Sequence, residues 1–560
     1  MTTPEPLLAI TDLSIDARTP EGLRPVLDGV SFALVPGETL CLAGESGSGK
    51  SLTALSIMRL LSPSLRQRGG SIKLAGRELT TLPERAMRQL RGGDIAMIFQ
   101  EPMTSLNPVM TIGAQLTEAI RIHGATDGGS AETRARAMLD AVHINEPARR
   151  LGQYPHELSG GMRQRVMIAM ALSCRPKVLI ADEPTTALDV TVQAQILTLM
   201  RELKGEFGTS IILITHDMGV VAEMADRVAL LRAGRMVEQG SLTQIFEQPR
   251  EAYTKQLLDA VPRLGAFRGT DGPPRVTAAP PPVLPAGPIL FVRDLEVTYG
   301  GATGWFGRGS PPPPVVKRVN FELKAGETLG LVGESGSGKS TIGKAVLGLI
   351  PFTGEVVIDG VAIAGLSPGA MKPVRRKAQM IFQDPYASLD PRMSVGESIA
   401  EPLAIHGIGT RNERRERVAL LLRRVHLTPD QATRYPHEFS GGQRQRICIA
   451  RALALEPKII VADESVSALD VSVRAHVLDL LLELQEEMGL SYLFISHDMA
   501  VVERMSHQVA VMRGGAFVET GSRRAVFENP VDTYTRALMR AVPVPIPSTI
   551  RHQDRVTASA

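Results

Sequence analysis

The 560-residue sequence has few cysteines, almost no net charge and no long uninterrupted apolar run. Its three cysteines, Cys41, Cys174 and Cys448, show no C-x-x-C spacing, which argues against a zinc site and against a disulfide framework. We interpret them as buried, reduced thiols that act as small apolar side chains. Cysteine chemistry is therefore not expected to contribute to function.

The near balance of basic and acidic residues argues against nucleic acid as a partner. Lysine and arginine number 62 against 59 acidic residues, so no basic field for nucleic acid is indicated. No stretch approaches the ~18–20 apolar residues that a membrane span needs. Residues 1–6 lack the basic and apolar regions of a signal peptide. We therefore expect a soluble, cytoplasmic chain that binds no nucleic acid.

Two copies of one eight-residue phrase are the most informative feature that is present. They are Gly44, Glu45, Ser46, Gly47, Ser48, Gly49, Lys50 and Ser51, and then Gly333, Glu334, Ser335, Gly336, Ser337, Gly338, Lys339 and Ser340. Each fits the pattern G-x-x-x-x-G-K-[ST], lies between a short apolar strand and a helical pattern, and predicts a loop that cradles phosphates. The lysine would contact the β/γ-phosphates and the last serine would hold magnesium. The chain is predicted to bind two nucleotides.

The repeat extends beyond these loops. Lys50 and Lys339 lie 289 positions apart, whereas Asp182 and Asp463 lie 281 apart, so two homologous domains differ slightly in length. The predicted boundaries are 1–262 for the first domain, 263–288 for a proline-rich linker, 289–543 for the second domain and 544–560 for a disordered tail. We expect the linker to be semi-extended rather than packed.

Strands alternate with helices in both domains. Residues 178–182 form a continuous apolar run that ends in a carboxylate, as in a central parallel strand buried on both faces. Residues 211–215 form another such run. The pattern predicts the α/β class with a mostly parallel sheet in each domain.

A further pair of motifs points to one family. Leu158-Ser159-Gly160-Gly161 and Phe439-Ser440-Gly441-Gly442 resemble the signature of ATP-binding cassette (ABC) transporter ATPases, as do Ala187-Leu188-Asp189 and Ala468-Leu469-Asp470. The resemblance covers almost the whole chain. It implies two tandem P-loop NTPase domains, each with a sheet core, an antiparallel β subdomain and a helical subdomain, and it implies ATP and Mg²⁺ as ligands.

Chemistry and resemblance together assign roles. A carboxylate adjacent to a strand-end aspartate can polarise water, and an imidazole can contact the γ-phosphate. The predicted catalytic residues are Glu183, His216, Glu464 and His497. The predicted magnesium ligands are Ser51, Gln100, Asp182, Ser340, Gln383 and Asp463. Besides the two phosphate loops, the predicted ATP-binding residues are Ser159, Gly160, Gly161, Tyr299, Ser440, Gly441 and Gly442.

Two implications of the family concern the pairing of the domains and the adenine base. The signature helix of each cassette would close over the nucleotide held by the other, so both cassettes would pair within one chain. Members of the family usually stack adenine on an aromatic residue. Tyr299 is available for this in the second cassette, whereas Ala17 stands at the matching place in the first.

Two longer sequence segments resemble one subgroup of the family. Residues 99–108 and 382–391, around the two glutamines, resemble ATPases of the dipeptide/oligopeptide/nickel import group, and the fusion of two cassettes is similar to ATPases of glutathione importers. The resemblance implies a peripheral protein on the cytoplasmic face of the bacterial inner membrane. Its partners would be two transmembrane permease subunits, docked beside the glutamines, and an extracytoplasmic solute-binding protein.

The expected function is therefore ATP hydrolysis that drives the import of peptides such as glutathione, dipeptides or oligopeptides. Importers of nickel or of opine-like solutes, exporters, and soluble ribosome-associated or DNA-repair ATPases with two cassettes are the alternatives. The short, nearly uncharged linker disfavours the ribosome-associated class, whose members carry a long, charged helical insert. The cargo does not follow from the cassettes, because they contact ATP and permeases rather than the solute.

Overall fold

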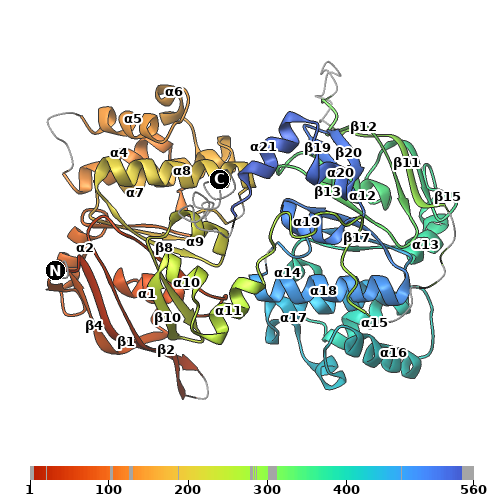
Figure 1. Ribbon diagram of the computed structural model, residues 1–560, viewed down its shortest axis with the longest axis horizontal. Helices are drawn as coiled ribbons and strands as arrows, with labels where there is room; N and C mark the ends of the chain where they lie inside the picture. Colours follow the sequence, from red (N-terminus) through yellow and green to blue (C-terminus); the bar gives the residue numbers. More distant parts are fainter. Residues whose placement is uncertain are drawn as a thin grey trace, which may run out of the picture. The chain divides into compact units, whose positions relative to one another are not determined.

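The computed structural model describes residues 5–19, 22–100, 105–124, 130–186, 188–277, 282, 284, 287–300, 312–467 and 469–544. The chain divides into two compact units, Met1–Val261 with Pro543–Ala560, and Pro262–Val542. Both units contain sheets and helices in the same order (Figure 1), which confirms the predicted α/β class. The predicted tail, residues 544–560, lies outside the described residues except for Val544, and so does the loop around Trp305, residues 301–311.

Each unit is built on a six-stranded sheet. In the first unit its order is β10-β9-β3-β8-β7-β6, and all neighbours pair in parallel except β10 with β9. The strands are β3 (Thr39–Ala43), β6 (Ile95–Ile98), β7 (Val178–Asp182), β8 (Ser210–Thr215), β9 (Arg227–Arg232) and β10 (Arg235–Ser241). Helices and a second sheet cover both faces, so the strands consist of continuous apolar runs.

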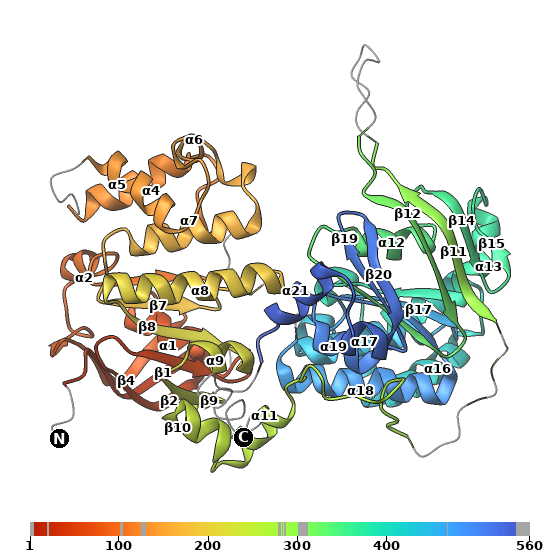
Figure 2. The ribbon, with the colours of Figure 1, turned by 45° about the horizontal axis from the view of Figure 1, so that its top comes forward.

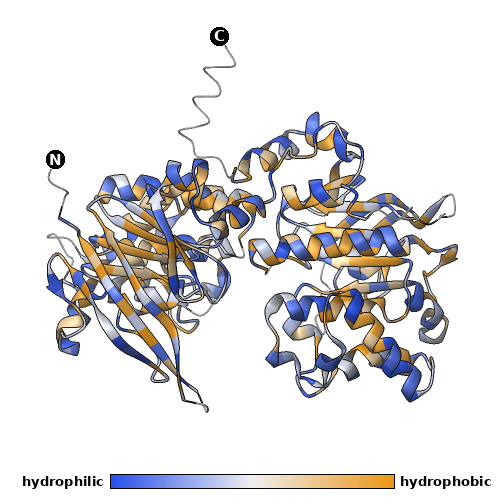
Figure 3. Cartoon of the chain, turned by 60° about the horizontal axis from the view of Figure 1, so that its bottom comes forward, coloured by the Kyte–Doolittle hydropathy of each residue, from blue (hydrophilic) through white to orange (hydrophobic). Residues whose placement is uncertain are grey.

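The sheet of the second unit has the corresponding order, β16-β17-β18-β13-β19-β20. Its strands are β13 (Thr328–Val332), β16 (Ala378–Ile381), β17 (Ile459–Asp463), β18 (Ser491–Ser496), β19 (Gln508–Arg513) and β20 (Ala516–Ser522). The buried strands stand out as apolar in Figure 3, whereas the outer helices alternate between polar and apolar residues.

A four-stranded antiparallel sheet lies against one face of each central sheet. The first comprises β1 (Leu8–Thr19), β2 (Gly22–Leu34), β4 (Leu65–Leu74) and β5 (Arg77–Glu78), and the second comprises β11 (Pro288–Val297), β12 (Val316–Lys324), β14 (Thr353–Ile358) and β15 (Val361–Ala362). In the first unit, side chains of β1 and β2 share a core with β3 and with α1 (Lys50–Ile57). This is the predicted antiparallel β subdomain.

Helices form the rest of each unit. In Figure 2 the helical cluster α4 to α6 of the first unit lies at the end opposite β1, β2 and β4. The helices of the first unit are α1, α2 (Glu84–Leu90), α4 (Ile112–Ile122), α5 (Ala131–Ala141), α6 (Pro147–Leu151), α7 (Gly160–Leu172), α8 (Val190–Phe207), α9 (Met218–Met224), α10 (Leu242–Glu247) and α11 (Ala252–Asp259). Those of the second are α12 (Lys339–Val346), α13 (Pro368–Lys377), α14 (Pro385–Ser388), α15 (Val395–Ile405), α16 (Arg411–Arg424), α17 (Gly441–Leu453), α18 (Val471–Met488), α19 (Met499–Met505), α20 (Arg523–Glu528) and α21 (Thr533–Ala541).

The thiols agree with their interpretation as core residues. Cys41 and Cys448 are buried, Cys174 is half-buried, and all three are free. Burial raises the pKa of the Cys448 thiol to about 12. Among the described helices, none combines the length and the apolar character needed to cross a membrane.

The structure corrects the prediction of an unpacked linker. Residues 264–277, which we call the strap, pack on the second unit through the side chains of Leu264 and Val276. Glu503 accepts a hydrogen bond from the backbone N–H of Gly265 at 2.6 Å, and Glu486 accepts those of Val276 and Thr277 at 2.8 Å. The proline-rich composition misled the prediction. The hydrogen bonds that hold the strap are made by its backbone N–H groups, which leave no apolar periodicity in the sequence. Residues 278–281, 283, 285 and 286 lie outside the described residues.

Arg523 holds the middle of the strap. Its fully buried guanidinium donates to the carbonyl and the hydroxyl of Thr270, and Glu503, itself 2% exposed, stabilises the arginine's charge. Without Arg523, the buried Glu503 carboxylate would lose the nearby positive charge that offsets its own, and an uncompensated buried charge costs about 3–5 kcal/mol.

We therefore expect Arg523→Ala to destabilise the second unit by about 3–5 kcal/mol, which scanning calorimetry of the full chain would show as an earlier transition. Arg524 is the matched control, because it is 53% exposed and its ion pairs are long, so Arg524→Ala should change stability by less than about 1 kcal/mol. Equal effects of the two substitutions would contradict a structural role for the strap.

Candidate functional site

The two predicted phosphate loops have the same geometry. Each follows a central strand, β3 or β13, and ends at the first residue of a helix, α1 or α12. The φ angles of Gly44, Gly47 and Gly49 are 142°, 73° and 103°, values that only glycine adopts without strain. A side chain on Gly44 would also meet the carbonyl oxygen of Leu231 at 2.2 Å. Glycines at these positions let the backbone curl closely, as a phosphate cradle requires.

In each phosphate loop, a lysine side chain donates hydrogen bonds to backbone carbonyls of the loop itself. The Nζ atom of Lys50 donates to the carbonyl oxygens of Gly44 and Glu45, both at 2.8 Å. Lys339 donates to the corresponding carbonyls of Gly333 and Glu334 at 2.8 and 2.7 Å. Both lysines are almost fully buried. Their charge therefore lies at the mouth of the helix, where a phosphate would be bound.

Next to each loop, a serine meets a strand-end aspartate. Ser51 Oγ donates to Asp182 Oδ1 at 3.1 Å, and Ser340 Oγ donates to Asp463 Oδ1 at 2.7 Å. Burial raises the pKa of Asp182 to about 6, against the opposing effects of Ser51 and Lys50, and it also raises the pKa of Asp463. Paired oxygen ligands of this kind fit a hard divalent cation. In the described part of the chain, no three acidic, histidine or cysteine side chains converge on one point.

The second carboxylate of each pair faces a histidine and a glutamine. Nδ1 of His216 lies 2.9 Å from Oε1 of Glu183, and Gln100 Nε2 donates to Glu183 Oε2 at 2.8 Å. Burial alone would raise the pKa of Glu183, but the hydrogen bond and charge of His216 outweigh it and lower the pKa to about 2. Glu183 is thus ionised and held at a strand end.

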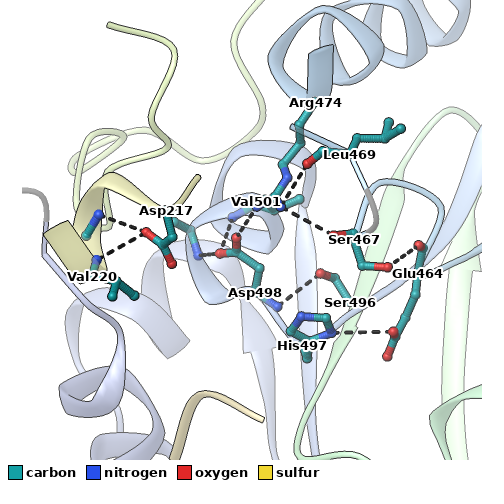
Figure 4. Close-up of polar contacts among 12 residues, drawn as sticks. Asp217, Val220, Glu464, Ser467, Leu469, Arg474, Ser496, His497, Asp498 and Val501 are labelled. Atoms are coloured by element: carbon teal, nitrogen blue, oxygen red, sulfur yellow. Dashed lines mark hydrogen bonds and ion pairs between the residues drawn. The ribbon is translucent and has the colours of Figure 1, made fainter. Parts of the chain in front are cut away.

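The second unit repeats this arrangement with longer contacts. His497 forms an ion pair with Glu464 at 3.4 Å (Figure 4). Gln383 Nε2 donates to Glu464 at 2.9 Å. Burial lowers the pKa of His497, but Glu464 has the larger combined effect and raises it. Both glutamines, predicted as magnesium ligands, contact the glutamate rather than the aspartate.

Both glutamates have a left-handed backbone. The φ angles of Glu183 and Glu464 are 47° and 44°, which is uncommon outside glycine and concentrates at functional sites. Their N–H groups continue the parallel ladder, because Glu183 donates to Ile214 and Glu464 to Ile495, each at 2.9 Å. The chain therefore turns sharply at the glutamate while the sheet still fixes its backbone.

The predicted signature residues begin α7 and α17. Ser159 caps α7 by accepting from the N–H of Met162, and Ser440 caps α17 by accepting from Gln443. A side chain on Gly160 would meet nothing within 4 Å, whereas one on Gly161 would meet Val192 at 2.8 Å. The first glycine thus leaves the helix N-terminus open to an anion, and the second permits close packing against α8.

Comparison with known proteins decides the family. The sequence profile described as "ABC transporter" matches residues 27–186 and 316–467, which is more than half of the chain. The chain belongs to the ABC transporter family. It is an ABC ATPase with two nucleotide-binding cassettes in one polypeptide, as its motifs indicated. A second profile, "Oligopeptide/dipeptide transporter, C-terminal region", matches residues 237–282 and 518–558.

Curated relatives cover almost the whole ABC chain. The glutathione import ATP-binding protein of Salmonella typhimurium is 57% identical over 94% of this chain and 87% of its own length. That of Escherichia coli is 54% identical over 98% of this chain and 91% of its own. A solved dimeric bacterial ABC transporter cassette covers 42% of this chain and 98% of its own, with 27% identity and a TM-score of 0.38.

Tyr299 and Ala17 stand at the predicted adenine-stacking position of the two cassettes. The hydroxyl of Tyr299 lies 3.3 Å from that of Thr341 on α12, which places this half-exposed ring beside the phosphate loop of the second cassette. In the first cassette, Ala17 pairs with Arg24 of β2 and offers no ring. Of the motif residues, Ala187, Ala468 and residues 101–104 lie outside the described residues.

Sequence reasoning missed two side chains near the glutamates. Thr186 Oγ1 donates to Glu183 Oε2 at 2.9 Å. Arg474 of α18 contacts Asp498, next to His497, and two backbone carbonyls of the loop after Glu464. Thr186 follows its glutamate by three residues, a signal that sequence alone could have offered. Arg474 lacks a comparable signal, because Gln193 stands at its place in the first cassette.

Proposed function

We propose that this chain is the energy-coupling subunit of an ABC importer for peptides, with glutathione as its first candidate substrate. The observation that carries the proposal is 54–57% identity, over nearly the whole chain, to glutathione import ATP-binding proteins. The two matches to the C-terminal region of oligopeptide/dipeptide transporters support the same class. The chain would act peripherally, on the cytoplasmic face of the inner membrane, with two permeases and an extracytoplasmic solute-binding protein.

In this proposal the phosphate loops bind ATP. The backbone of residues 44–51 would surround the phosphates, and Lys50 would exchange its carbonyl contacts for the β/γ-phosphates. Ser51 and Asp182, which already share a hydrogen bond, would hold Mg²⁺, with Gln100 in reach of the adjoining carboxylate. When bound, Mg²⁺ neutralises charge on the β- and γ-phosphates. Ser340, Asp463 and Gln383 would do the same in the second cassette.

The glutamates and histidines would act on water. Glu183 is ionised and fixed, so it can orient and polarise a water molecule for in-line attack on the γ-phosphate. His216, which now bonds to Glu183, would turn its ring to the γ-phosphate. Glu464 and His497 would have these roles in the second cassette. In line with the family, Ser440 to Gly442 would complete the first site, and Ser159 to Gly161 the second.

The permease would dock beside the glutamine segments. In the second unit a groove of about 480 Å³ lies between α13, α15 and α17, lined by Met371, Phe382, Ile405 and Arg451 among others. Ile405 is 61% exposed, so an apolar side chain there is available to a partner. Phe382 immediately precedes Gln383, which would join permease contact to the site of hydrolysis.

The two cassettes should differ in ATP affinity. Stacking of a base on an aromatic ring contributes about 1–3 kcal/mol, so a binding titration of the full chain should resolve a tighter second site and a weaker first site. Tyr299→Ala should weaken the tighter site about 5- to 150-fold, whereas Tyr299→Phe should leave it within about twofold. Equal affinities of the two sites in the unmodified chain would refute the adenine-stacking role of Tyr299.

An uptake assay tests the function. A strain lacking this gene should lose uptake of labelled glutathione or of short peptides, and a plasmid copy should restore it. A copy carrying Glu183→Gln and Glu464→Gln should not. Unchanged uptake of glutathione, dipeptides and oligopeptides in the deletion strain would overturn the proposal, and a loss limited to nickel would favour that cargo instead.

A further inference from the structure

The two cassettes hold the loop after the catalytic glutamate by different means. In the first, Thr186 Oγ1 donates to the carboxylate of Glu183 at 2.9 Å. In the second, Ser467 occupies the corresponding position, but its hydroxyl donates to the backbone carbonyl of Glu464 at 2.9 Å. Among the described residues, Glu183 thus has three side-chain partners and Glu464 has two.

In the second cassette, Arg474 contacts the loop after Glu464 from the neighbouring helix α18. It lies in the first turn of α18, and its side chain is 15% exposed. Its guanidinium donates to the carbonyl oxygens of Ser467 at 3.4 Å and Leu469 at 3.2 Å, and to Asp498 Oδ2 at 3.2 Å (Figure 4). A planar guanidinium with five donors can bridge three acceptors in this way, whereas a glutamine cannot.

Asp498 connects this network to the histidine. Its Oδ1 caps α19 by accepting from the N–H groups of Ala500 and Val501, which leaves Oδ2 for the arginine. His497 precedes Asp498 directly and faces Glu464. One side chain therefore joins the loop that follows the glutamate to the loop that carries the histidine.

The first cassette provides the comparison. Asp217 caps α9 as Asp498 caps α19, by accepting from Gly219 and Val220. Gln193 stands in place of Arg474 and donates to Asp217 Oδ2 at 3.5 Å through its neutral side-chain amide. The caps are alike, so the difference lies at Gln193 and Arg474, and at Thr186 and Ser467.

We propose that Arg474 is a positioning residue for ATP hydrolysis in the second cassette, where it sets the placement of Glu464 and His497 by joining their two loops. The inference rests on the proposed roles of Glu464 and His497. It follows that the two cassettes depend on different side chains for the same chemistry.

Steady-state hydrolysis by the full chain tests this. In a chain that carries Glu183→Gln, so that only the second cassette hydrolyses, Arg474→Gln installs the residue of the first cassette and should lower kcat about three- to tenfold. ATP affinity should stay within about twofold of the parent, because the arginine acts on the glutamate and not on the nucleotide. Arg474→Lys should restore part of kcat through the charge. Gln193→Ala, made in a chain that carries Glu464→Gln so that only the first cassette hydrolyses, is the matched control. It should change kcat less than about twofold, since it removes one long hydrogen bond from a neutral amide.

Asp498→Asn supplies an independent variant if Arg474→Gln fails to fold. Asparagine keeps the helix cap but loses the charge that pairs with Arg474. It should lower kcat as Arg474→Gln does, and the double variant should be no worse than either single one. An unchanged kcat in either variant, a fall explained by weaker ATP binding, or multiplying effects in the double variant would overturn the proposal. A chain with Glu464→Gln that hydrolyses ATP normally would overturn the role of Glu464 instead.

Discussion

A chain that carries both Glu183→Gln and Glu464→Gln is expected to bind ATP normally and to lose at least about 100-fold in turnover, the usual contribution of a general base. The substitution keeps the size of the side chain and removes its negative charge. The contact with His216 fixes that charge at the strand end and, against the effect of burial, lowers the pKa of Glu183 to about 2. A neutral amide there can no longer polarise water.

Two measurements separate this outcome from a general loss of structure. Phosphate release reports turnover, and equilibrium binding of a fluorescent ATP analogue reports occupancy. Glu202 serves as the control. Among the described residues, the polar partner of this exposed side chain of α8 is the exposed His143, so Glu202→Gln should hydrolyse ATP normally. Near-normal hydrolysis by the double variant would exclude the two glutamates as the groups that polarise water.

Much of the fold could be predicted from local patterns. Continuous apolar runs such as residues 178–182 became the central parallel strands, because burial on both faces requires apolar side chains at every position. The phosphate loops were equally accessible, since a lysine, a serine and glycines with positive φ form one contiguous motif. The structure then placed Glu183, Gln100 and His216, which are distant in sequence, in direct contact.

The features that the sequence did not predict depend on contacts that leave no local pattern in the sequence. The strap looked like a free linker, since its proline-rich sequence lacks periodicity, yet three glutamates accept its backbone N–H groups. Arg474 carries no motif in the sequence, and only the structure shows its carbonyl and carboxylate acceptors. Both cases involve backbone groups as partners, and backbone groups are the same for every sequence.

Lys50→Ala and Lys339→Ala are expected to weaken ATP binding at their own cassettes about 10- to 150-fold, because each removes a charged hydrogen-bond donor from the phosphates. In the ATP-free loop these lysines bond to the carbonyls of Gly44 and Glu45 or of Gly333 and Glu334. Each variant therefore also leaves two carbonyl oxygens without that donor. Loop stability and phosphate binding must be separated.

The two cassettes provide each other's control. A titration of each single variant with ATP should show one weakened site and one unchanged site, and thermal unfolding without ATP should reveal how much the loop itself has lost. Stabilisation by saturating ATP, which grows with ligand concentration relative to Kd, should fall in each variant by the amount that the weakened site contributed. If either alanine variant retained two sites of parental affinity, its lysine would hold the loop in shape without contacting phosphate.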